Sequence, residues 1–169
     1  MLCMQWKNHR LTTCAVTYAL TGSFPATAIA TAASALPDVL ELKLIKHRTL
    51  THYPWLPLMP AALVWRSMQH EPGYILYVCF FILVGYVGHL AEDLLGNSGL
   101  PFWNPRGKRT GLHLYATRTP SEYVVALTIV MAALLYSWQN GMFGQAYLLQ
   151  AADNTALFVT GMARHFSKV

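Results

Sequence analysis

Residues 74–90 form a long apolar stretch, YILYVCFFILVGYVGHL, that contains no Asp, Glu, Lys or Arg. A helix needs about 20 mostly apolar residues to cross the roughly 30 Å hydrocarbon core of a bilayer, so this stretch is typical of a membrane span. The whole chain is only 11% charged, whereas a soluble domain is usually about a quarter charged. So few charges cannot cover a water-soluble globule of 169 residues, which indicates that lipid surrounds much of the surface.

Four further apolar stretches complete the pattern. Residues 123–138 predict a second clear span, and residues 143–162 a weaker one that polar side chains interrupt. Residues 54–65 carry early prolines, which suit the start of a helix better than its centre. Residues 11–36 are broken by the sequence TGSFP, which indicates a turn between two short helices. We therefore expect an all-α fold, a polytopic membrane helical bundle with about four full spans and a short N-terminal helical hairpin, in one domain over residues 1–169.

The basic residues test this topology. If the chain turns near Gly22, Pro72 and Asn140, only Arg66 lies toward one face. The opposite face then carries Lys7, Arg10, Lys43, Lys46, Arg48, Arg106, Lys108, Arg109, Arg118, Arg164 and Lys168. Because basic residues collect on the cytoplasmic side, the pattern predicts a multi-pass protein of the bacterial inner membrane with both termini in the cytoplasm. A single span over residues 11–36 would instead divide the basic residues between the two faces.

The N-terminal region also has a second interpretation. Lys7 and Arg10, the apolar run and the sequence ASA at 33–35 resemble a secretory signal peptide with its cleavage site. Phe24 and Pro25 within the apolar run weaken that interpretation.

Most ionisable side chains fall on the predicted cytoplasmic face. This face holds His9, Asp38, Glu41, His47, His52, His89, Glu92, Asp93, His113, Glu122 and His165, whereas the other face offers only His70 and Glu71. Ionisable groups at membrane helix ends are costly to hold and usually have a functional reason. The asymmetry is the main indication of function in the sequence.

His89 and Asp93 form an H-x-x-x-D pattern at the end of the strongest span. Residues four apart share one helix face, so an imidazole and a carboxylate at these positions can bind the same divalent ion. Gly85 and Gly88 would let another backbone approach closely. The alternative is a local His–Asp hydrogen bond that satisfies both groups.

His47 and His52 lie in the short polar segment HRTLTH before the proline-rich stretch. Their spacing suits a loop that wraps an ion, with Thr49 and Thr51 as partners that fix the imidazole tautomers. The alternative is a basic interfacial loop that touches anionic headgroups.

Asp38 follows the second short helix and is either a metal ligand or base, or a helix cap. Glu122 belongs to the sequence TPSE, which matches a capping box and favours capping over catalysis, with support of a metal ligand as a weaker alternative. The basic residues of the loop before it are topology determinants or, alternatively, hold a phosphate: Arg106, Lys108 and Arg109.

Five segments occur in a characteristic order: LPD (36–38), HRTLTH (47–52), GYVGHLAEDLL (85–95), GLPFWNP (99–105) and TPSE (119–122). Together they resemble the YdjM-like family of membrane-bound metal-dependent hydrolases, some of which are described as LexA-regulated. The resemblance covers the chain from His9 to about Glu122. This sequence departs from the family pattern at Leu40, Thr49, Tyr53 and Asn97, which alter the surroundings of the candidate ligands.

The resemblance implies a metal site made of His9, Asp38, His47, His52, His89 and Asp93. The family is also distantly similar to zinc-dependent phospholipases C and single-strand nucleases, which implies phosphoester hydrolysis with Asp38 as a catalytic residue. Zinc is the expected metal, because His with carboxylate suits it, although manganese or iron also fit.

Two functions remain open at this point. The first is a metal-dependent hydrolase at the cytoplasmic face that acts on a phosphoester or a lipid. The second is a non-catalytic integral membrane protein with a structural metal or none. The expected partners are the lipid bilayer and a phospholipid or phosphoester substrate. No specific nucleic-acid binding is expected, and the sequence specifies no oligomeric state.

Overall fold

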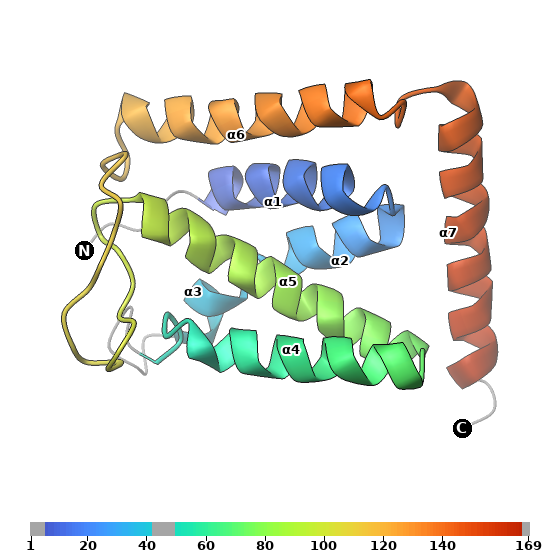
Figure 1. Ribbon diagram of the computed structural model, residues 1–169, viewed down its shortest axis with the longest axis horizontal. Coiled ribbons are helices and arrows are strands. Elements are labelled where there is room, and N and C mark those ends of the chain that lie inside the picture. The colour runs from blue at the N-terminus through green and yellow to red at the C-terminus, as the bar shows by residue number, and fades with distance from the viewer. Residues whose placement is uncertain (1–5, 42–49, 167–169) are drawn as a thin grey trace.

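The computed structural model describes residues 6–41 and 50–166, and every element named within them is a helix (Figure 1). The helices are α1 (Trp6–Thr21), α2 (Phe24–Ala33), α3 (Leu36–Glu41), α4 (Trp55–His70), α5 (Tyr74–Leu95), α6 (Pro120–Gln139) and α7 (Gln145–Phe166). The predicted all-α fold is therefore confirmed for the described residues.

The N-terminal hairpin breaks where the sequence predicts. Gly22 adopts φ +60°, a left-handed conformation that glycine accepts without a steric penalty. Ser23 then caps α2 by accepting a hydrogen bond from the backbone amide of Ala26 at 3.3 Å. The hairpin lies inside the bundle, because α1 packs against α2, α5 and α6, as Figure 1 shows.

Small residues bring α2 and α5 close together. Ala26, Ala30 and Ala33 on α2 are buried. A Cβ atom at Gly85 of α5 would collide with the backbone carbonyl of Ala30. Small side chains let helix backbones approach closely in membranes, where no hydrophobic effect drives helices together. The contact places the C-terminal end of α2 beside the last turns of α5.

Two of the described helices, α5 and α6, are long and apolar enough to cross a membrane. Both coincide with the clearest predicted spans. Helix α4 begins after Pro54, as the early prolines predict, but has only 16 residues. The prediction of about four full spans is therefore not confirmed.

Helix α7 lies across one end of the bundle (Figure 1). Near its start, Tyr147 lies where a Cβ at Gly22 would stand. Near its end, the ring of His165 lies 6.3 Å from that of Tyr74 at the start of α5. Both ends of α7 therefore contact the same end of the bundle, and the span predicted for residues 143–162 is not confirmed.

The segment between α5 and α6 folds back on the C-terminal end of α5. Leu100 and Thr110 exchange two backbone hydrogen bonds of 2.9 Å. The backbone amide of Leu112 donates to the carbonyl of Leu94 at 2.8 Å, and the Tyr115 hydroxyl donates to the carbonyl of Glu92 at 2.8 Å. These contacts fix the end of α5 that carries His89 and Asp93.

Candidate metal centre

Polar side chains from four parts of the chain meet at the end of the bundle opposite α7. His9 comes from the first turns of α1 and Asp38 from α3, while His52 precedes α4. His89 and Asp93 come from the last turns of α5. The three imidazoles and Asp93 are each at most 1% exposed, so the cluster is shielded from solvent.

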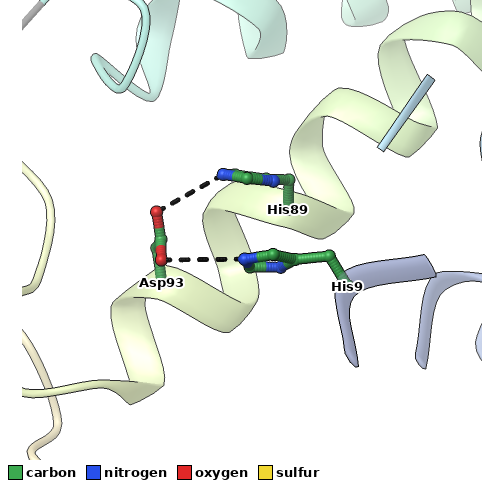
Figure 2. Close-up of side chains that lie close together, drawn as sticks. All are labelled: His9, His89 and Asp93. Atoms are coloured by element: carbon green, nitrogen blue, oxygen red, sulfur yellow. Dashed lines mark ion pairs between the residues drawn. The ribbon is translucent and has the colours of Figure 1, made fainter. Parts of the chain in front are cut away.

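Asp93 faces two of the imidazoles (Figure 2). Its Oδ2 lies 3.5 Å from Nε2 of His89, and its Oδ1 lies 4.0 Å from Nε2 of His9. The rings of His9 and His89 are stacked with centroids 3.9 Å apart. The H-x-x-x-D pattern thus meets a third candidate ligand from α1, and these three residues form one group able to hold a metal ion.

Asp38 and His52 form a second such group with the same His89. Nε2 of His52 lies 3.5 Å from Oδ1 of Asp38 and 3.2 Å from Oδ2 of Asp93. Oδ1 of Asp38 also lies 3.7 Å from Nε2 of His89. Because the groups share His89 and meet at Asp93, they form one continuous cluster.

The other ring nitrogen of each imidazole faces an oxygen. Nδ1 of His89 lies 2.7 Å from the carbonyl oxygen of Ser34, which only accepts hydrogen bonds, so this Nδ1 carries the proton. Nδ1 of His52 lies 3.0 Å from Oε1 of Glu41, and Nδ1 of His9 lies 3.2 Å from Oε2 of Glu92. Metal-binding histidines typically have such a partner, which fixes the tautomer and leaves the other nitrogen available to the metal.

The two glutamates are themselves held in place. Thr51 donates to Oε1 of Glu41 at 2.6 Å, and its hydroxyl lies 3.1 Å from Nδ1 of His52. The hydroxyl of Thr12 donates to Oε1 of Glu92. Thr51 thus makes the contact expected of a partner that orients an imidazole.

Asp38 is held by a residue of α1. Its Oδ2 accepts a hydrogen bond of 2.9 Å from Nε1 of Trp6, while its Oδ1 faces the imidazoles of His52 and His89. Asp38 lies in the first turn of the short helix α3. The alternative, that it only caps a helix, leaves these imidazole contacts unexplained.

The donor set fits a divalent metal ion. Four buried or nearly buried carboxylates, Asp38, Glu41, Glu92 and Asp93, surround the three imidazoles. Burying such negative charge is costly unless positive charge balances it. Nε2 of His9 makes no hydrogen bond within the described residues. A metal ion between the Nε2 atoms and the aspartates would balance the buried negative charge and would also give Nε2 of His9 a partner.

The remaining predicted site residues fall elsewhere. His47 and Thr49 lie outside the described residues. Arg106 and Lys108 are exposed and Arg109 is half-buried in the segment between α5 and α6, which lies at the cluster end of the bundle (Figure 1). Their role in binding a phosphate therefore stays a prediction.

Glu122 makes different contacts from those of the predicted capping box. Thr119 makes no side-chain cap for α6. Glu122 instead accepts hydrogen bonds from Nδ2 of Asn8 at 2.5 Å and from the backbone amide of Arg118 at 2.6 Å. It is fully buried and connects the start of α6 to Asn8, the residue before His9, because α1 and α6 pack against each other.

The sequence predicts that Glu41 and Glu92 share the face of the cluster but assigns them no role in it, and it does not predict the contact of the Ser34 carbonyl at all. Glu92 directly precedes Asp93, yet only the position of α1 shows that it faces His9. Glu41 lies one helical turn after Asp38, which is a spacing that could have indicated a shared face. Every residue has a backbone carbonyl, so the residue type at Ser34 does not indicate that its carbonyl contacts the cluster.

The fold and the cluster together define a helical membrane protein with a buried His/carboxylate centre. Residues 4–166 match the model of the family described as YdjM inner membrane protein, and the chain belongs to this family. The resemblance drawn from the sequence motifs is thereby confirmed, as is an inner-membrane location. No curated protein and no solved structure matches the chain.

Proposed function

We propose that this chain is a metal-dependent hydrolase that cleaves phosphoester bonds, with its site in the cluster of His9, Asp38, His52, His89 and Asp93. One observation supports the proposal most strongly. The Nε2 atoms of all three imidazoles face Asp38 or Asp93, while each Nδ1 faces an oxygen. A cluster of residues that merely cap helices would not need this common orientation.

Zinc is the metal that we propose for the site. Imidazole nitrogen with carboxylate oxygen is a usual donor set for zinc, and catalytic sites commonly use three protein ligands. A bound divalent ion would supply Lewis-acid chemistry, by polarising a phosphoryl oxygen and activating water. The two candidate groups of ligands would accommodate one ion each or share one.

Asp38 is the candidate general base. Its Oδ2 is oriented by Trp6, so Oδ1 is directed to the cluster and can accept a proton from an attacking water. Asp93, which is almost fully buried, is better suited to a ligand than to proton exchange with solvent. Arg106, Lys108 and Arg109 carry positive charge at the same end of the bundle, and we propose that they attract the phosphate of the substrate.

The cluster lies at the cytoplasmic face in this proposal. The same end of the bundle carries Lys7, Arg10, Arg106, Lys108, Arg109 and Arg118, which the positive-inside rule places in the cytoplasm together with the N-terminus. A cytoplasmic C-terminus would require α7 to cross the bilayer. Because α7 lies across the opposite end, its position argues against that part of the topology prediction.

The test is hydrolysis of a phospholipid in mixed detergent micelles. The purified protein is stripped with a chelator and then supplied with zinc, manganese or iron, and release of the phosphate-containing headgroup is measured. We expect activity to return with the metal, and Asp38→Asn to lower it by about 100-fold or more, the usual contribution of a general base. Asp153→Asn, an exposed aspartate on α7, is the matched control and should stay active.

Two results would contradict the hydrolase proposal. A metal-loaded protein that cleaves no phospholipid or soluble phosphodiester would support the alternative of a non-catalytic membrane protein with a structural metal. Activity that persists unchanged in Asp38→Asn would exclude the proposed base.

A further inference from the structure

An apolar groove leads away from the cluster along the bundle. Its volume is about 480 Å³, within the range of pockets that hold small ligands. Helices α1 and α5 form its length with Val16, Leu20, Phe80 and Val84, and Trp65 of α4 also lines it. Its lining is almost wholly apolar.

The groove ends beside the candidate metal centre, and Glu92 separates it from the cluster. Glu92 lines its inner end and lies 3.2 Å from Nδ1 of His9. Gly88, which also lines it, directly precedes His89. A molecule whose apolar part lies in the groove would therefore bring its polar end to Glu92, next to the cluster.

The length of the groove suits one lipid chain. Thr12 and Leu20 both line it on α1, and eight residues of α-helix extend about 12 Å. One leaflet of a bilayer contributes about half of the roughly 30 Å hydrocarbon core. The groove thus extends from the cluster over most of the depth of one leaflet.

Thr13 supplies a second observation that points to a ligand. Its side chain lines the inner part of the groove and is 5% exposed. Its hydroxyl makes no hydrogen bond among the residues that the structure describes. A buried hydroxyl usually has a partner, and a polar atom of a molecule in the groove would supply it.

We propose that the groove binds one acyl chain of a membrane phospholipid, with its ester oxygen at the Thr13 hydroxyl and its phosphate at the His/Asp cluster. This inference rests on the proposed phosphoester hydrolysis and names the substrate class as a diacyl phospholipid. The occupant is a lipid chain rather than a protein helix, because the groove is apolar and is lined by α5, a helix long and apolar enough to cross the membrane.

The test is photolabelling of the detergent-purified protein with phosphatidylglycerol that carries a diazirine in one acyl chain. Labelled residues are located by mass spectrometry, and unlabelled phosphatidylglycerol is the competitor. We expect competable labelling at Val16, Leu20 and Val84. Val84→Trp fills the groove and should abolish this labelling, whereas Val124→Trp makes the same change on the exposed surface of α6 and should leave it intact.

Thr13→Val keeps the shape of the side chain and gives a second variant that is expected to fold. The concentration of unlabelled phosphatidylglycerol needed to compete with the label should rise by about threefold to tenfold, which corresponds to the loss of one hydrogen bond. Thr31→Val is its control, because the Thr31 hydroxyl also lacks a partner among the described residues but lies outside the groove.

Labelling spread evenly over α6 and α7, without competition and unchanged in Val84→Trp, would overturn the inference, as would a groove occupied by a helix of a second copy in cross-linking. Metal content is measured on the same samples. Groove labelling in a protein without metal would reject the proposed hydrolase but not the lipid site. Metal without groove labelling would reject the lipid site alone.

Discussion

At the scale of single residues, the orientation of the imidazoles carries most of the functional meaning. His9, His52 and His89 come from different parts of the chain, yet each directs Nδ1 to an oxygen and Nε2 to an aspartate. The partners of Nδ1 are Glu92, Glu41 and the Ser34 carbonyl. Such partners raise the basicity of a ligand and hold its ring in place.

Removing the charge of one partner tests this arrangement. Glu41→Gln keeps the size of the side chain but weakens the hold on Nδ1 of His52, so we expect metal affinity to fall by about 10-fold to 100-fold. The affinity is measured by competition with a chromophoric chelator. Glu71→Gln, at an exposed position beyond α4, is the control. Equal affinities in both variants would show that Glu41 does not support the site.

At the scale of elements, the close contact of α2 with α5 positions the cluster. Gly85 faces the backbone of Ala30, and the same helix α2 ends beside Ser34, whose carbonyl accepts from His89. A change in the spacing of these helices would therefore move the Ser34 carbonyl and shift the ring of His89 in the metal centre.

Gly85→Ala should separate the two helices. Because the new methyl group collides with the Ala30 carbonyl, we expect destabilisation by about 1–3 kcal/mol, the usual cost of overpacking. Thermal unfolding in detergent measures the change, and metal affinity should fall with it. Gly73→Ala is the control, because its Cβ would meet nothing within 4 Å. A Gly85→Ala protein as stable as this control would show that the close approach is not required.

At the scale of the whole molecule, the bundle has two different ends. One carries the cluster and the segment between α5 and α6, and the other is covered by α7 (Figure 1). Because α5 and α6 are long and apolar enough to cross a membrane, the proposed topology places these ends at opposite membrane faces.

Cysteine labelling tests this arrangement. In a chain whose Cys3, Cys14 and Cys79 are replaced by serine, Asp153→Cys on α7 should react with an impermeant maleimide in intact spheroplasts, because the proposed topology places α7 at the outer face. Lys108→Cys should react only after the membrane is permeabilised. Protection of both cysteines until permeabilisation would instead place α7 and the C-terminus as the charge pattern predicts.

The contrast between prediction and structure has a physical reason. Apolar stretches and breaks such as Gly22 act locally, so the helices and the N-terminal turn follow from the sequence. The spacing of His89 and Asp93 is also local. By contrast, the placement of α7 and the approach of Glu92 to His9 depend on how helices cross. The pattern along one helix does not specify that crossing.

The central claim is that the cluster binds metal, and metal content by mass spectrometry of the detergent-purified protein tests it most directly. The parent chain should carry a stoichiometric divalent metal, and His89→Ala/Asp93→Ala should lose it while keeping its helical content. The control His70→Ala/Asp153→Ala removes the same residue types from exposed positions and should retain the metal. A parent chain that is free of metal and also fails to bind added zinc, manganese or iron would contradict the account.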